Sequence, residues 1–126
     1  MEFRSDLGRV RGLGSTWMGV HHFWMQRLTG IALIPLIIWF VFAATGLVGA
    51  DLATMKAWVG RHYNPVLLGL LIIAIYHHGQ LGLQVVIEDY VHNEGVKTAS
   101  IIVVKLAAVL LAASSLFAIM RLTFGS

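Results

Sequence analysis

Three long apolar runs constrain this chain more than any other feature. They lie between Arg27 and Asp51, between Arg61 and Glu88, and between Lys97 and Arg121. Each reaches the roughly 20 residues that a membrane-spanning helix needs, and backbone that faces lipid must satisfy its hydrogen bonds within such a helix. The sequence therefore predicts an all-α membrane protein with three transmembrane helices. We place these helices near residues 24–48, 65–90 and 99–122.

The composition agrees with a membrane protein and excludes several kinds of site. Hydrophobic residues make up 58% of the chain and charged residues only 12%, which lies outside the usual range of a soluble domain. The absence of cysteine excludes a disulfide framework, an iron–sulfur cluster or a cysteine-ligated haem within the chain. No basic face with interleaved aromatic residues is present, so we expect no binding of nucleic acid.

We read residues 1–126 as one membrane-anchor domain, in which residues 1–20 form a cytoplasmic arm that is ordered only against a partner. Between the first two helices, Leu52, Met55 and Trp58 recur at helical spacing, which predicts a short interfacial helix within residues 49–63. The expected signals at the helix ends are Asn64-Pro65 at the start of the second helix, Gly95 at its end and Thr98 at the start of the third.

Lysine and arginine indicate the orientation. The N-terminal segment and the connection after the second helix lie on one side of a three-helix protein, and the first connection and the C-terminus lie on the other. The first side carries Arg4, Arg9, Arg11, Arg27 and Lys97, against Lys56, Arg61 and Arg121 on the second. By the positive-inside bias we place the N-terminus in the cytoplasm of a bacterium, with the chain in the inner (cytoplasmic) membrane. The mitochondrial inner membrane is the less favoured alternative. Lys105, about two turns into the third helix, is expected to snorkel to the cytoplasmic side.

The second helix carries two polar stripes. At 100° per residue, His78, Gly82 and Asp89 share one face, while His77, Gln80 and Gln84 form a stripe on another. A lone helix in lipid would not carry both, so we expect packing on two sides, with partner chains involved.

His78 is the first candidate for a cofactor site. An imidazole at this depth either binds a metal, of which haem iron is a common example, or forms a hydrogen bond to a neighbouring helix. Glycine one turn away, at Gly82, lets a planar group lie close to the backbone. His77 and His78 cannot both ligate one iron from one face, so one of them needs the hydrogen-bonding explanation in any case.

Asp89 and Tyr90 end the second helix at the membrane boundary. A tyrosine beside a carboxylate there is suited to donating a hydrogen bond to a quinone carbonyl, although an interfacial tyrosine and a solvated acid have the same pattern. Arg27 opposes the helix dipole at the start of the first helix, where haem propionates or lipid headgroups would neutralise it. A topology anchor is the other interpretation of Arg27.

These residues give the chain a recognisable pattern. His78-x3-Gly82, followed by Asp89-Tyr90, and an earlier His-x5-Arg at His21 and Arg27 resemble the small D-type hydrophobic membrane anchor of succinate dehydrogenase (respiratory complex II). The start of the first helix, residues 26–30, is similar to the alpha-proteobacterial and mitochondrial branch of that family.

The resemblance implies one half of a heterodimeric anchor bundle. A second, C-type anchor subunit, also of three helices, would share one haem b, with His78 as the axial ligand on this chain, Gly82 against the haem, and Arg27 and His21 near its propionates. Tyr90 would contact ubiquinone, with Asp89 as its acidic neighbour. The pair would anchor an iron–sulfur subunit and a flavoprotein subunit among membrane lipids.

In such a complex electrons pass from succinate to ubiquinone, and this chain is a non-catalytic subunit of the enzyme. The alternative function is a haem-free structural anchor of a respiratory complex.

Overall fold

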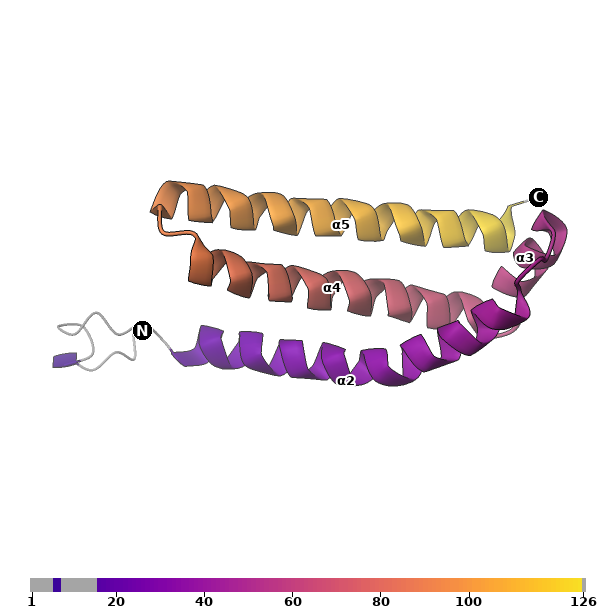
Figure 1. The fold of residues 1–126 in the computed structure, drawn as a ribbon, viewed down its shortest axis with the longest axis horizontal. Coiled ribbons are helices and arrows are strands. Elements are labelled where there is room, and N and C mark those ends of the chain that lie inside the picture. Colours follow the sequence, from indigo (N-terminus) through magenta and orange to yellow (C-terminus); the bar gives the residue numbers. More distant parts are fainter. Residues whose placement is uncertain (1–5, 8–15, 126) are drawn as a thin grey trace.

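The computed structural model describes residues 6–7 and 16–125 (Figure 1). Its helices follow in the order α2 (Thr16–Gly46), α3 (Leu52–Val59), α4 (Asn64–Tyr90) and α5 (Glu94–Phe124). Three of them, α2 from Gly19 onward, α4 and α5, are long and apolar enough to cross a membrane. The predicted fold class, an all-α protein with three transmembrane helices, is therefore confirmed.

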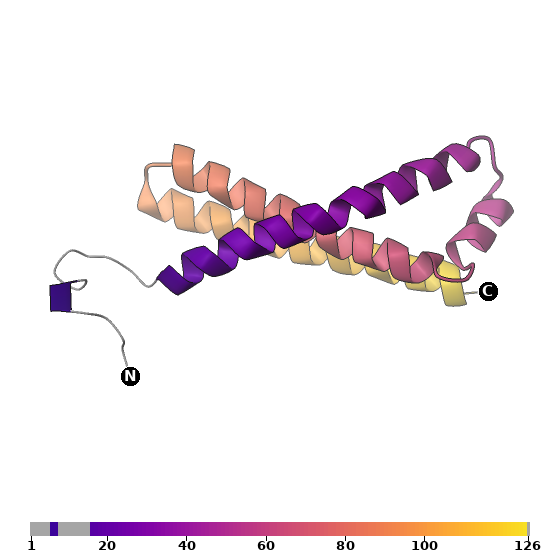
Figure 2. The same ribbon diagram turned by 90° about the horizontal axis from the view of Figure 1, so that it is seen from below.

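Helix α4 is the central element. It packs against both α2 and α5, and α2 crosses the α4–α5 pair obliquely (Figures 1 and 2). Leu33 of α2 and Leu71 and Ala74 of α4 form a buried cluster, against which Leu36 packs. Of the three spans α4 has the lowest mean hydropathy, 1.7, and the largest buried share, 28%. The buried side chains of α4 are all apolar, and its polar residues His77, His78, Gln80 and Gln84 are half-buried. The packing of α4 on two sides, which the two polar stripes predict, is present.

The remaining helix surfaces are apolar and open. Within the described residues, α5 carries no buried side chain, and Leu106, Val109 and Leu110 are each about two-thirds exposed. Lipid tails are as apolar as these side chains, so their exposure costs little in a bilayer. The faces of α2 and α5 that point away from α4 are therefore available to lipid or to other protein chains.

Two helices begin earlier than predicted. The first helix starts at Thr16 rather than near residue 24, because the sequence before Trp24 contains no proline to stop it. Of the predicted arm, residues 1–5 and 8–15 lie outside the described residues, and Thr16–Val20 belong to α2. The third helix starts at Glu94 because the Asn93 side chain accepts a hydrogen bond from the Val96 amide (3.0 Å).

The predictions that Gly95 ends the second helix and that Thr98 caps the third are therefore wrong. Gly95 lies in the first turn of α5 rather than at the end of α4, and Thr98 lies inside α5, because Asn93 caps that helix first. At the start of α4 the capping position is Tyr63. The Asn64 side chain does not cap α4 but donates to the Trp58 carbonyl (2.7 Å), which ties α4 to α3.

The predicted interfacial helix is present as α3. Asp51 is its N-cap, and the carboxylate accepts a hydrogen bond from the Thr54 amide (2.8 Å). Hydrogen bonding to Thr54 lowers the pKa of Asp51 below its ordinary value of 3.8. The contribution of this cap to stability is therefore fully present above the ordinary pKa of an aspartate and is lost as the pH falls through the lowered pKa.

We expect Asp51→Ala to increase the hydrogen-exchange rate of the α3 amides about fivefold at neutral pH, because the first turn loses its cap. Asp51→Asn keeps an acceptor oxygen and should exchange as the wild type does. Exchange measured by mass spectrometry on the purified complex checks both variants, and equal rates in all three proteins would show that the cap contributes nothing.

Candidate functional site

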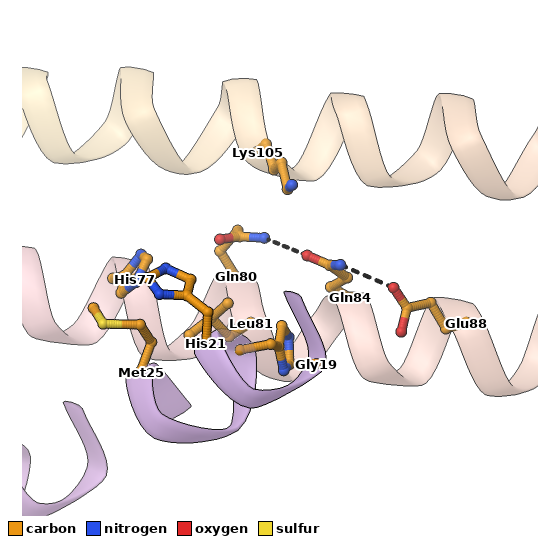
Figure 3. Close-up of a pocket in the computed structure, with 10 residues that line it drawn as sticks. Gly19, His21, Met25, His77, Gln80, Leu81, Gln84, Glu88 and Lys105 are labelled. Carbon is orange, nitrogen blue, oxygen red and sulfur yellow. Dashed lines mark hydrogen bonds between the residues drawn. The ribbon is translucent and has the colours of Figure 1, made fainter. Parts of the chain in front are cut away.

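A cavity lies between α2 and α4 near the N-terminal end of α2, with one side chain from α5 (Figure 3). Its volume is about 490 Å³. The lining residues are Gly19, His21, His22 and Met25 of α2, His77, Gln80, Leu81, Gln84 and Glu88 of α4, and Lys105 of α5. Three histidines and two amides on the wall of a membrane-embedded cavity make it the main candidate site, since polar groups at this depth usually serve a function.

The second polar stripe that the sequence predicts on α4 forms one wall of this cavity. The Gln80 amide donates to the Gln84 side-chain oxygen (3.1 Å), and the Gln84 amide donates to a Glu88 carboxylate oxygen (2.8 Å). Lys105 extends from α5 toward this row of side chains (Figure 3). The hydrogen-bonded row runs from Glu88 near the end of α4 toward His77, so it connects the boundary of the membrane with its interior.

His77 and His78 face different surroundings. The Nε2 atom of His77 is buried and has no hydrogen-bond partner within the part of the chain that the structure describes, and the same holds for Nε2 of His22 and Oε1 of Gln26. Buried polar atoms in native proteins are paired with very few exceptions. Water or another subunit must therefore complete this part of the molecule.

The His78 ring turns toward α2. Its Nδ1 atom lies 3.1 Å from the hydroxyl oxygen of Thr29, the one polar residue that is buried among the described residues. A Cβ atom added to Gly30 would lie 3.3 Å from Cε1 of His78, so glycine leaves room for the ring beside α2. The sequence-based candidates do not include Thr29. The feature of the sequence that could have identified Thr29 is a hydroxyl side chain at the start of an otherwise apolar run, immediately before a glycine.

The hydrogen bonds of the Thr29 hydroxyl favour one tautomer of His78. A threonine hydroxyl has one proton to donate, and here it points to the Met25 carbonyl at 2.7 Å, with the Gln26 carbonyl at 3.2 Å. The Thr29 oxygen is then an acceptor for His78 Nδ1–H. A neutral imidazole protonated at Nδ1 keeps its lone pair at Nε2, the form in which histidine binds a metal.

The other predicted residues lie in different surroundings. Gly82 faces α2 as His78 does, since a Cβ there would lie 3.8 Å from the amide nitrogen of Gln26. His21 lines the cavity. Arg27 is exposed, with its guanidinium 4.6 Å from the centre of the Phe23 ring. Asp89 and Tyr90 are both exposed at the C-terminal end of α4.

The structure thus brings His78 and Gly82 onto one face of α4, against α2, and leaves Arg27, Asp89 and Tyr90 open to other chains. Among the described residues, no group of three or more histidine or acidic side chains is placed to hold a metal ion alone. A metal centre here would therefore need ligands from a cofactor or a partner.

Comparison with known proteins extends the resemblance. The family described as succinate dehydrogenase/fumarate reductase transmembrane subunit matches residues 1–112. The chain is 31% identical over 109 residues to the succinate dehydrogenase hydrophobic membrane anchor subunit of Rickettsia bellii, covering 86% of this chain and 87% of the relative. It is 29% identical over 97 residues to the succinate dehydrogenase membrane anchor subunit of Reclinomonas americana (75% and 81%).

The corresponding protein of Paracoccus denitrificans is 26% identical over 126 residues (100% and 97%). No solved structure matches this chain. The relatives include alpha-proteobacterial and mitochondrial-like sequences, as residues 26–30 predict, and all are membrane anchors. Together with three membrane-length helices, the matches show that this multi-pass chain belongs to the succinate dehydrogenase/fumarate reductase transmembrane subunit family.

Proposed function

We propose that this chain, as the D-type anchor of a succinate:ubiquinone oxidoreductase, binds one haem b jointly with a second three-helix anchor subunit and helps to form the ubiquinone site. The observation that carries the proposal is the contact between His78 and Thr29. It holds the ring by Nδ1 and leaves the lone pair of Nε2 for iron.

The residues of the chain fit a haem on chemical grounds. A histidine that ligates a metal almost always donates its other N–H to an oxygen acceptor, and this second contact orients the ring. Thr29 supplies that acceptor, itself anchored to the Met25 carbonyl. Gly82 on the same face adds no side chain beyond its backbone. When bound, the haem would supply one-electron redox chemistry within the membrane.

The second axial ligand belongs to another chain in this proposal. Adjacent histidines on one helix cannot both reach one iron from one face, so His77 is not the second ligand. The exposed guanidinium of Arg27 can pair with a propionate, as a fork-shaped donor suits a carboxylate, and His21 in the cavity wall is the second candidate for that role.

Tyr90 and Asp89 would form this chain's share of the ubiquinone site. Both side chains are exposed at the end of α4, and Tyr90 is 78% exposed. Reduction of a quinone places negative charge on its carbonyl oxygens, and a phenol O–H within hydrogen-bond distance stabilises that charge. Asp89 would orient the phenol or receive a proton from solvent. Succinate oxidation would take place on the flavoprotein and iron–sulfur subunits, which this chain anchors.

The orientation remains as the charge distribution predicts it, with the N-terminus and the end of α4 in the cytoplasm and the chain in the bacterial inner membrane. The soluble subunits would then dock on the side that carries Asp89, Tyr90 and the cavity. A protease-accessible tag on the N-terminus should be cleaved in inverted but not in right-side-out membrane vesicles. Cleavage in right-side-out vesicles alone would reverse the orientation.

The test of the haem proposal is the haem content of the complex purified from its native membrane. We expect one extractable haem b for each copy of this chain. A complex that is active in quinone reduction but contains no haem would establish the haem-free anchor, in which the Thr29 contact alone satisfies His78.

Thr29→Val tests the orienting contact. We expect about tenfold weaker retention of haem, because His78 loses the acceptor that holds its ring. Thr29→Ser restores the hydroxyl and should behave as the wild type. Thr45→Val is a matched control, since Thr45 is an exposed α2 residue whose hydroxyl donates to the Phe42 carbonyl. The loss of haem during dilution, followed by optical absorption, measures haem retention in all three variants. If Thr29→Val retains haem as well as the wild type does, Thr29 has no part in the site.

A further inference from the structure

At the far end of the bundle α3 lies beside the C-terminal end of α5 (Figure 1). Side chains of these two helices line another hollow. Its volume is about 370 Å³. Lys56 of α3 and Arg121 of α5 supply two cationic side chains, and the rest of the lining is Phe117, Ala118, Leu122 and Gly125. The hollow therefore combines two positive charges, from two separate helices, with an apolar wall and no carboxylate among its described lining residues.

The fold fixes α3, and with it Lys56, on all three long helices. Trp58 stacks on Trp39 of α2, with ring centres 5.9 Å apart and an interplanar angle of 22°. The Asn64 side chain of α4 donates to the Trp58 carbonyl (2.7 Å). Gly60 lies against α5, since a Cβ there would be 3.8 Å from the Thr123 backbone. These contacts hold α3 in place, so the side of the hollow that α3 supplies has a defined position.

Charge at this end of the bundle is unbalanced. Among the side chains that the structure describes, Lys56, Arg61 and Arg121 lie there with one carboxylate, that of Asp51, which accepts a hydrogen bond from the Thr54 amide. Glu88, Asp89 and Glu94 lie at the other end of α4 and α5. Two cations on an apolar surface at a membrane boundary attract an anion that has an apolar part of its own.

We propose that this hollow binds one anionic phospholipid, with its phosphate between the Lys56 ammonium and the Arg121 guanidinium. Phe117 lies one turn before Arg121 on the same face of α5, about 6 Å further into the membrane. It lies where an acyl chain leaves the headgroup, and Leu122 adds to the apolar wall. A guanidinium forms paired hydrogen bonds with phosphate oxygens, and lysine adds a point charge. This site is independent of haem and of quinone.

The experiment uses the purified complex in nanodiscs that contain phosphatidylglycerol and phosphatidylcholine in equal amounts, with retained lipid counted by native mass spectrometry. Each cation near the membrane surface strengthens the attraction about fivefold, so we expect about a 30-fold preference for phosphatidylglycerol at one site. Lys56→Gln combined with Arg121→Gln should abolish it. Arg61→Gln removes a charge at the same end but outside the hollow, and should retain it.

Three results would overturn the proposal: no lipid preference in the wild type, an unchanged preference in the double variant, or an equal loss in Arg61→Gln. If another subunit supplies a carboxylate to these cations instead, the wild type shows no preference and the double variant loses that subunit. Should the double variant fail to assemble, the wild-type preference still decides, and the exchange of both residues (Lys56→Arg with Arg121→Lys) should preserve it.

Discussion

His78→Ala should yield a complex that has lost its b-type optical band, whereas His77→Ala should retain it. His78 is the proposed iron ligand of this chain, and alanine offers no atom to replace it. His77 lies one residue away on α4 but faces the cavity, and its Nε2 atom has no hydrogen-bond partner among the described residues. The measurement is the reduced-minus-oxidised spectrum of each purified variant, scaled to the amount of this chain.

The paired variants separate ligation from general disturbance of the membrane domain. Both remove an imidazole from the same turn of α4, so a fold-wide effect would act on both. Loss of the band in His77→Ala alone would transfer the ligand role to His77, and loss in neither would exclude both as ligands. His78→Gln keeps a polar side chain beside Thr29 and should assemble without the band.

Tyr90→Phe should slow quinone reduction about a hundredfold while leaving succinate oxidation by an artificial electron acceptor unchanged. The substitution removes only the phenol O–H, whose proton stabilises charge on the quinone oxygen in the transition state. Tyr90 is 78% exposed at the end of α4, so the change leaves no cavity in the packed part of the chain.

Tyr63→Phe is the matched control, since Tyr63 is 77% exposed at the opposite end of α4. It should leave both rates unchanged. The two assays on the same preparation separate the quinone step from assembly. If Tyr90→Phe reduces quinone at the wild-type rate, its hydroxyl plays no part in the reaction. If both rates fall together, Tyr90 acts in docking of the soluble subunits.

The spans and polar stripes follow from the sequence because they depend on local periodicity. Apolar runs of membrane length give helices whatever their neighbours, and 100° per residue correctly places Gln80 and Gln84 with His77 on the cavity wall. His78 and Gly82 share the α2 face for the same reason. Helical periodicity alone thus determines the angular position of each side chain about its own helix.

Contacts between helices do not follow from periodicity. The pairing of Thr29 with His78 joins residues 49 positions apart and depends on how α2 crosses α4. The same holds for Lys105, which reaches the cavity wall from α5 (Figure 3). The predicted helix ends are wrong by a few residues: Asn93, rather than Thr98, caps α5. Arg27 is proposed to act together with a partner chain, and its side chain is exposed in the structure of this chain alone.

If His78 ligates haem iron together with a residue of another chain, the EPR spectrum of the oxidised wild-type complex should carry the signature of that ligation. We predict a low-spin ferric haem signal, as two axial protein ligands give, that disappears in His78→Ala. A high-spin signal from a haem with one protein ligand, or a complex without any haem signal, would contradict it.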